Sequence, residues 1–197
     1  MTTSQRLYLS SEIPWNASYM TSEGYIVYKT EPPPSWTEEV KTIKLLRANP
    51  PYSESTTTNV SFSTLAEIQY RNVHKAQIQL YDGRDSQPKN VFFRKKGLSF
   101  LGPRNRVFMS PIGGEYMWKI GSTSKLFSND SRRNPVAVFH KAKGGIIRRS
   151  RPAYLEISVD KEELMDIIVA TFVYMEKLRM ERKDIVELVA NAVSTLG

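Results

Sequence analysis

One stretch of this sequence, Leu164–Met175, is apolar over almost its whole length. Only Asp166 and Thr171 interrupt the run LMDIIVATFVYM, so a helix formed here has no polar face and must be surrounded by protein. A helix over this range spans about 18 Å, whereas the hydrocarbon core of a bilayer is about 30 Å thick. We therefore predict a helix buried at the centre of one domain, with a buried β-strand as the alternative because several residues are β-branched.

The flanking residues define the ends of this helix. Asp160 followed by Glu163 is a capping-box pattern, so we expect the helix to cover about 160–180, and the charged stretch after Met175 to emerge into water. Residues 183–197 are expected to form a separate amphipathic helix that packs outside the domain or mediates self-association. Its apolar positions recur at helical spacing and are Ile185, Leu188, Val189, Ala192, Val193 and Leu196.

Short runs rich in β-branched and aromatic residues fill the chain from residue 36 onward. Several alternate apolar and polar residues, as in Ala76–Leu80, and pairs such as Asp82-Gly83 and Gly113-Gly114 favour hairpin turns. The predicted fold is mainly β, a closed antiparallel β-barrel of about 10–12 strands around the buried C-terminal helix. We expect an irregular N-terminal extension over 1–35, holding one short strand from Gly24, and a barrel with its central helix over 36–182.

The composition excludes several kinds of chemistry. The chain has no cysteine and only two histidines, His74 and His140, so we expect no disulfide, metal site or cofactor. Neither a P-loop nor a GxSxG or HExxH motif occurs, which favours a non-enzymatic protein over an enzyme. His140 ends an apolar strand and is expected to be a hydrogen-bonded structural residue. The N-terminus lacks the apolar run of a signal peptide, so we expect a cytoplasmic protein.

Positive charge is concentrated in the middle of the chain. The net charge is +8, but the segment Arg71–Arg151 holds 18 Lys/Arg against 4 Asp/Glu, a net +14. Such a segment can attract an anionic partner, unless the side chains are scattered over a solvated surface. The candidate anion- or lipid-binding residues are Arg94, Lys95, Lys96, Arg104, Arg106, Lys141, Lys143, Arg148, Arg149 and Arg151.

Nucleic acid is a less favoured partner for this segment. Phe92, Phe93, Phe100 and Phe108 lie among the basic residues, as stacking side chains would. At strand period, however, most of them fall opposite the charged positions and are expected in the core.

Three motifs carry a resemblance to a known family. They are GGEYMWK (Gly113–Lys119), NPVAVFHKAKGG (Asn134–Gly145) and LEISVDKEELMDIIVATFVYMEKLRMER (Leu155–Arg182), and in this order they are similar to an uncharacterised domain family of mushroom-forming fungi. The strand-rich body followed by one apolar helix also resembles the tubby-like architecture of tubby proteins, phospholipid scramblases and LURP-one-related proteins. The resemblance implies a barrel that encloses the helix, and some tubby-like barrels bind phosphoinositide head groups through basic residues. It implies no catalytic residue.

These observations favour an intracellular binding module attracted to anionic phospholipid or phosphoinositide head groups, peripheral at membranes. A structural or protein-interaction module that self-associates, for example through 184–197, is the alternative. Asp166 needs an explanation in either case, because an unpaired buried carboxylate is costly. We expect its place near the helix start, at the barrel mouth, to suffice; an Arg, Lys or backbone partner is the other explanation.

Overall fold

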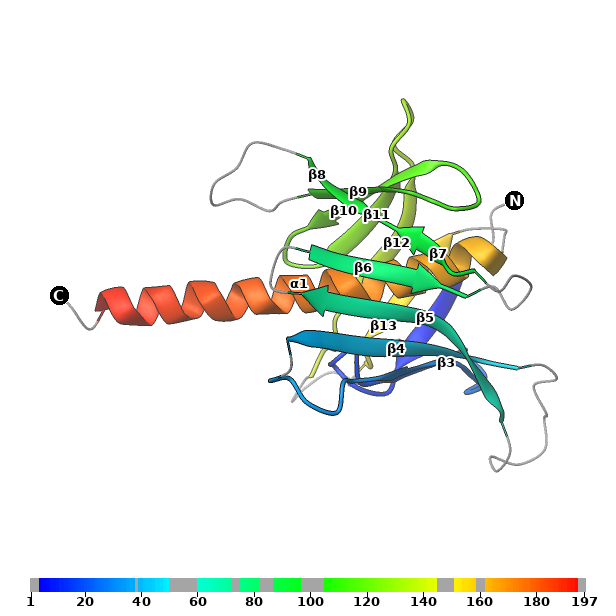
Figure 1. Cartoon of the computed structure of the whole chain (residues 1–197), viewed down its shortest axis with the longest axis horizontal. Coiled ribbons are helices and arrows are strands. Elements are labelled where there is room, and N and C mark those ends of the chain that lie inside the picture. The colour runs from blue at the N-terminus through cyan, green and yellow to red at the C-terminus, as the bar shows by residue number, and fades with distance from the viewer. Residues whose placement is uncertain are drawn as a thin grey trace.

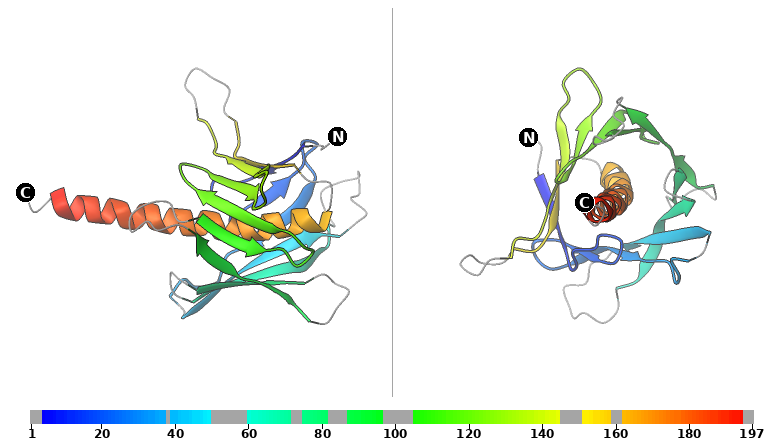
Figure 2. Two further views of the ribbon diagram at one scale, coloured as in Figure 1. Left: turned by 90° about the horizontal axis from the view of Figure 1, so that it is seen from above. Right: turned by 90° about the vertical axis from the view of Figure 1, so that its left-hand side faces the viewer.

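The computed structural model describes residues 4–37, 39–49, 60–71, 75–81, 87–96, 105–144, 151–158 and 162–194. Within these ranges, a 13-stranded antiparallel sheet curls around one helix, α1 (Glu162–Ser194) (Figure 1). Seen along the helix, the sheet surrounds it almost completely (Figure 2). The predicted mainly β barrel around a C-terminal helix is confirmed, with thirteen strands in place of about 10–12.

The strands run up and down in chain order. They are β1 (Ser4–Leu9), β2 (Ser18–Met20), β3 (Ile26–Glu31), β4 (Val40–Ala48), β5 (Phe62–Arg71), β6 (Lys75–Leu80), β7 (Lys89–Val91), β8 (Phe93–Lys96), β9 (Asn105–Met109), β10 (Glu115–Ile120), β11 (Ser124–Ser128), β12 (Pro135–His140) and β13 (Tyr154–Ser158). Only β1 and β13 are neighbours in the sheet without being neighbours in sequence. The edges of the sheet are β7 and β8.

The N-terminal segment belongs to the barrel, whereas an irregular extension was expected over 1–35. Strand β1 pairs with β13 in the register Ser4↔Ser158 to Tyr8↔Tyr154, and β2 and β3 continue the sheet on its other side. Tyr19 and Tyr28 of these strands are fully buried. The pairing of β1 with β13 joins chain segments about 150 residues apart, so no local pattern could reveal it.

Helix α1 is continuous, whereas a separate helix was expected over 183–197. Neither Gly nor Pro interrupts it. The ion pair Lys177–Glu181 (3.4 Å) supports a partly buried turn, and Lys183–Glu187 (3.3 Å) supports an exposed one. Its C-terminal part extends beyond the barrel (Figure 1). The predicted cap, Asp160, lies outside the described residues. In the described part of the chain, no helix has both the length and the apolarity that crossing a membrane requires.

The apolar part of α1 forms the centre of the core, as the sequence predicted. Phe172 is fully buried, and its ring centroid lies 4.9 Å from that of Phe139, 6.2 Å from Trp118 and 6.4 Å from Tyr19. The three rings that contact Phe172 lie on β12, β10 and β2. The helix therefore holds opposite sides of the barrel together through aromatic contacts.

Asp166 is held by partners at the start of the helix. It is 7% exposed, and its carboxylate accepts hydrogen bonds from the Tyr28 hydroxyl (2.7 Å) and from Nη1 of Arg47 (2.8 Å). Arg47 also pairs with Glu162 one turn earlier. Burial raises the pKa of Asp166, while the bonds from Tyr28 and Arg47 oppose the rise. Asp166 thus lies near the helix start, as expected, but it is buried there, so that this position does not suffice and the partners Tyr28 and Arg47 are needed as well.

Candidate functional site

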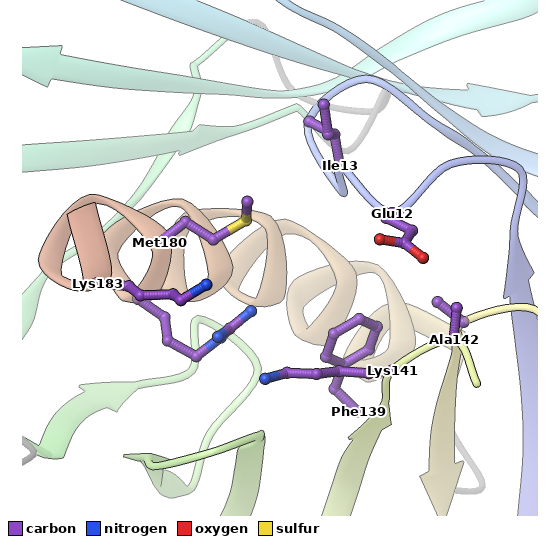
Figure 3. A pocket seen from close by; sticks show the side chains of 9 residues that line it. Glu12, Ile13, Phe139, Lys141, Ala142, Met180 and Lys183 are labelled. Atoms are coloured by element: carbon purple, nitrogen blue, oxygen red, sulfur yellow. The ribbon is translucent and has the colours of Figure 1, made fainter. Parts of the chain in front are cut away.

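A pocket of about 310 Å³ opens where α1 leaves the barrel (Figure 3). We call it the rim pocket. Three parts of the chain form its wall: the β1–β2 loop, the β12–β13 connection and the exposed turns of α1. The lining residues are Glu12, Ile13, Phe139, Lys141, Ala142, Ala153, Arg179, Met180 and Lys183.

Antiparallel pairing explains why basic residues reach this rim. Arg179 of α1 lines the pocket beside Lys141, which places the end of β12 and the start of β13 at the exit of the helix. Alternating strand direction then carries the end of β8 and the start of β9 to the same end of the barrel. Lys96 at the end of β8 and Lys141 after β12 thus lie toward the same end of the barrel.

Three cations line the rim pocket itself. In Figure 3 the side chains of Lys141 and Lys183 extend into the same space, and Arg179 lines it with them. The pKa of Lys141 is lowered, first by burial and then by the positive charges of Arg179 and Lys183, while the carboxylate of Glu176 acts in the opposite direction. The pocket therefore has a positive potential that favours an anion.

A buried carboxylate fixes one of these cations. Glu176 is 0% exposed and accepts hydrogen bonds from Nε and Nη2 of Arg179, the latter at 2.7 Å, and from the Ser124 hydroxyl. Arg179 is therefore held in a defined orientation with much of its charge compensated. This contradicts the expectation that the charged stretch after Met175 emerges directly into water.

Lys141 is the cation with the least compensation. Among the described residues no carboxylate forms an ion pair with it, whereas Arg179 pairs with Glu176 and Lys183 with Glu187. It is also the lysine whose pKa reflects desolvation in this pocket. An incoming anion would find its most available partner here.

The rest of the pocket wall is mostly apolar. Phe139 is almost fully buried, Ile13 is partly exposed, and Met180 packs against the hydrophobic core. Figure 3 shows Glu12 on the opposite side of the pocket from Lys183. The pocket can thus contact both a charged group and an apolar part of a ligand.

The predicted basic residues of β8 and β9 are divided between the two faces of the sheet. Arg94 forms an ion pair with Glu115, and Nζ of Lys96 donates to Oδ1 of Asn129 at 3.1 Å. Arg106 instead points inward and is 3% exposed. Lys95 is exposed at the register position opposite Arg106.

Lys143 and Arg151 lie together beyond the ends of β12 and β13. Their backbones form an isolated antiparallel bridge, and the Arg151 guanidinium lies 4.9 Å from the centre of the Tyr154 ring. Arg104, Arg148 and Arg149 lie outside the described residues. The described candidates therefore do not face one common pocket, and among them only Lys141 lines the rim pocket.

The aromatic residues among these cations mostly face the core. Phe108 is buried, and Phe93 is partly buried with its ring centroid 5.5 Å from that of Phe108. Phe92 is 66% exposed between β7 and β8, and Phe100 lies outside the described residues. Core packing thus accounts for Phe93 and Phe108, as the strand period predicted.

His140 belongs to a polar cluster on the barrel wall. Its Nε2 lies 3.1 Å from Oε2 of Glu156, and its ring stacks on Tyr154 with a centroid distance of 4.3 Å. Arg6 and Ser4 of β1 also contact Glu156. This cluster links β1, β12 and β13, which agrees with the structural role expected for His140. His74 lies outside the described residues.

Sequence reasoning did not identify Arg179 and Lys183 as members of a pocket. The available signal was their spacing with Glu176, because positions three and seven apart share one face of a helix. Nothing in the sequence paired that face with Lys141, since the contact depends on how the helix is rotated in the barrel.

Comparison with known proteins identifies the family of the chain. No curated protein and no solved structure matches it. A family model described as "Family of unknown function (DUF6593)" matches residues 12–181, a range that contains Lys141 and Arg179 and ends before Lys183. The chain therefore belongs to this family of unknown function, an uncharacterised domain family as its motifs predicted.

Proposed function

We propose that this protein is a non-enzymatic binding module that holds a phosphate-bearing anionic head group in the rim pocket. The observation that carries the proposal is Lys141, a partly desolvated ammonium without an ion-pair partner among the described residues, beside two further cations. Ammonium and guanidinium groups at close quarters are suited to phosphate oxygens. The apolar side chains around them would contact the remainder of the ligand.

The proposed physiological ligands are anionic phospholipids, phosphoinositides in particular, at a membrane facing the cytoplasm. Each basic side chain near an anionic membrane contributes about 1 kcal/mol to the free energy of binding to that membrane. Because α1 extends beyond the same rim, a head group would be held beside the helix. A soluble inositol phosphate should then occupy the pocket as well as a head group in a vesicle.

Co-sedimentation with vesicles tests this proposal. The full chain should pellet with phosphatidylcholine vesicles that contain a phosphoinositide at physiological salt, and soluble inositol trisphosphate should release it. The double variant Lys141→Met/Lys183→Met should bind about 30-fold more weakly, because two contributions of about 1 kcal/mol are lost.

Lys44→Met is the matched control. Lys44 is an exposed lysine of β4, between the buried residues Ile43 and Leu45, and its loss removes one positive charge, as each of the single changes Lys141→Met and Lys183→Met does. This variant should bind vesicles almost like the wild type. Equal recovery of the wild type with neutral vesicles would overturn the proposal, and a salt-dependent shift of nucleic acid in a gel would favour the rival anion.

A second candidate function, self-association, is favoured by the projecting end of α1. The helix continues about 16 Å past Lys183, and its sequence keeps an apolar residue at each helical repeat up to Val193. A short helix is marginally stable alone in water, so a second copy of this segment would stabilise it. Light scattering of the full chain and of a variant lacking 184–197 tests this; a monomer in both cases would refute it.

We also infer a relationship with the tubby-like barrels and an origin of the family in mushroom-forming fungi. The inference is supported by the common plan of antiparallel strands around a C-terminal helix, and by motifs that fall on β10, on β12 and on β13 with α1. A solved structure of a relative, superposed on a tubby-like barrel strand by strand, tests it. A different strand order around the helix would refute the relationship.

A further inference from the structure

On the inner face of β9, one nitrogen of a buried guanidinium lacks an acceptor. Arg106 is 3% exposed, and its Nη1 has no hydrogen-bond partner. No ion pair links Arg106 to a carboxylate in the described part of the chain. A buried charge without a counter-charge is unfavourable, so an anion bound next to Arg106 would stabilise it.

A second donor without an acceptor lies close by. The Tyr70 hydroxyl of β5 is buried and has no hydrogen-bond partner, and the Tyr70 ring centroid lies 5.7 Å from that of Tyr174 on α1. Burial raises the pKa of Tyr174, while the charge of Arg106 and its hydrogen bond to that hydroxyl oppose the rise. Tyr174 therefore stands between two unsatisfied donors. A water molecule could satisfy the hydroxyl but would supply no counter-charge. The carboxylate of Glu181, which raises the pKa of both Tyr70 and Tyr174, forms an ion pair with Lys177 at 3.4 Å.

The surroundings of these groups are aromatic. The Phe93 ring centroid lies 4.7 Å from that of Tyr174 and 5.5 Å from that of Phe108. Lys95, opposite Arg106 in the register, adds a second positive charge at the end of β8. Cationic donors above aromatic rings suit an oxyanion that carries an apolar body.

We propose that Arg106, Tyr70 and Tyr174 form an internal binding site for an oxyanion, the carboxylate or phosphate group of a small amphipathic ligand. The site is separate from the rim pocket, because none of its three residues, which come from β5, β9 and α1, lines that pocket. It does not depend on the function proposed for that pocket. Arg106 supplies the charge, and the two hydroxyls supply further donors.

Thermal unfolding of the full chain tests the site. The probes are inorganic phosphate and octanoate, each compared with sodium chloride at equal ionic strength, so that a free oxyanion and one on an apolar chain are distinguished. At about 100 times its dissociation constant, a bound probe should raise the Tm by roughly 5 to 10 °C.

Arg106→Met should abolish this rise, while the Tm without probe stays equal to or above that of the wild type because the unpaired charge is gone. Arg94→Met, on the exposed side of the neighbouring strand, should keep the full rise. Tyr70→Phe preserves the ring and should bind the probe several-fold more weakly, which keeps the test valid if Arg106→Met fails to fold.

Three outcomes would overturn the inference. One is a wild type whose Tm responds to neither probe. Another is an Arg106→Met variant that responds like the wild type. The third is a response that is lost in Lys141→Met and kept in Arg106→Met, because it would place the anion in the rim pocket.

Discussion

The indole N–H of Trp118 on β10 donates a hydrogen bond to the Thr171 hydroxyl of α1 at 3.1 Å, and both residues are completely buried. The Thr171 hydroxyl donates in turn to the carbonyl oxygen of Ile168 at 3.1 Å. Thr171 is thus the acceptor that satisfies the Trp118 N–H within an apolar core. The contact fixes the rotation of the helix relative to the barrel wall.

Thr171→Val should destabilise the protein by about 1 to 3 kcal/mol, because the buried Trp118 N–H loses its acceptor while the side-chain shape is nearly kept. Urea denaturation followed by tryptophan fluorescence measures the change. Thr171→Ser is the matched control: it retains the hydroxyl and should lose about 1 kcal/mol for one methyl group. A Val variant as stable as the wild type would show that this hydrogen bond makes no net contribution.

Phe172→Ala should cost about 3 to 5 kcal/mol of the free energy of unfolding, because the ring contacts Phe139, Trp118 and Tyr19 at the centre of the barrel. Val186→Ala, on the same helix but 67% exposed, should change stability by less than about 0.5 kcal/mol. Chemical denaturation of both variants checks the expectation. Similar small effects at both positions would contradict a core centred on α1.

Asp166 should make stability depend on pH in an unusual direction for a carboxylate. Burial raises its pKa in the folded protein, so the folded state holds the proton more tightly than the unfolded state. The contribution of Asp166 to stability should therefore be greatest below its ordinary pKa and should fall as the pH rises through the raised folded value.

Asp166→Asn isolates this effect, because the amide oxygen can still accept from Tyr28 or Arg47 but does not titrate in this range. The stability of the wild type minus that of Asp166→Asn, measured by urea denaturation across the acidic to neutral range, should decrease with rising pH. An increase would show that the ion pair with Arg47 outweighs desolvation.

Lys141 should titrate below the ordinary range of lysine, because burial and the charge of Arg179 disfavour its protonated form. NMR of the ¹³C-dimethylated lysines as a function of pH measures this. Arg179→Met should move the pKa of Lys141 back upward, and Glu176→Gln should lower it further by removing the opposing carboxylate. An unchanged titration of Lys141 in both variants would contradict the geometry of the rim pocket.

The central helix and the barrel could be predicted because both depend on the order of apolar and polar residues over short stretches of the sequence. Leu164–Met175 is apolar on every side, and a helix of that kind needs a wall around it. The N-terminal strands could not be predicted in the same way. Their place depends on the pairing of β1 with β13, which joins the first and the last strand of the sheet in chain order.

The basic residues show the same division between local and tertiary information. Strand alternation correctly separates the two faces of β9, but it does not say which face is inside, and the register places Arg106 in the interior. In the sequence, Arg179 belongs to a charged stretch that was expected to be solvated. Only the packing of α1 beside β11 and β12 buries Glu176 and places Arg179 in one pocket with Lys141.

The sequence by itself thus determined that a buried helix is surrounded by antiparallel strands, and that positive charge is concentrated in the segment from Arg71 to Arg151. The tertiary structure alone decided that Lys141 meets Arg179 and Lys183, and that Arg106 lies next to Tyr174 inside the barrel. The physical reason is that periodicity defines which side chains share a face of one element. Which faces meet depends on strand register, sheet closure and the rotation of the helix, all of which are set by contacts between distant residues.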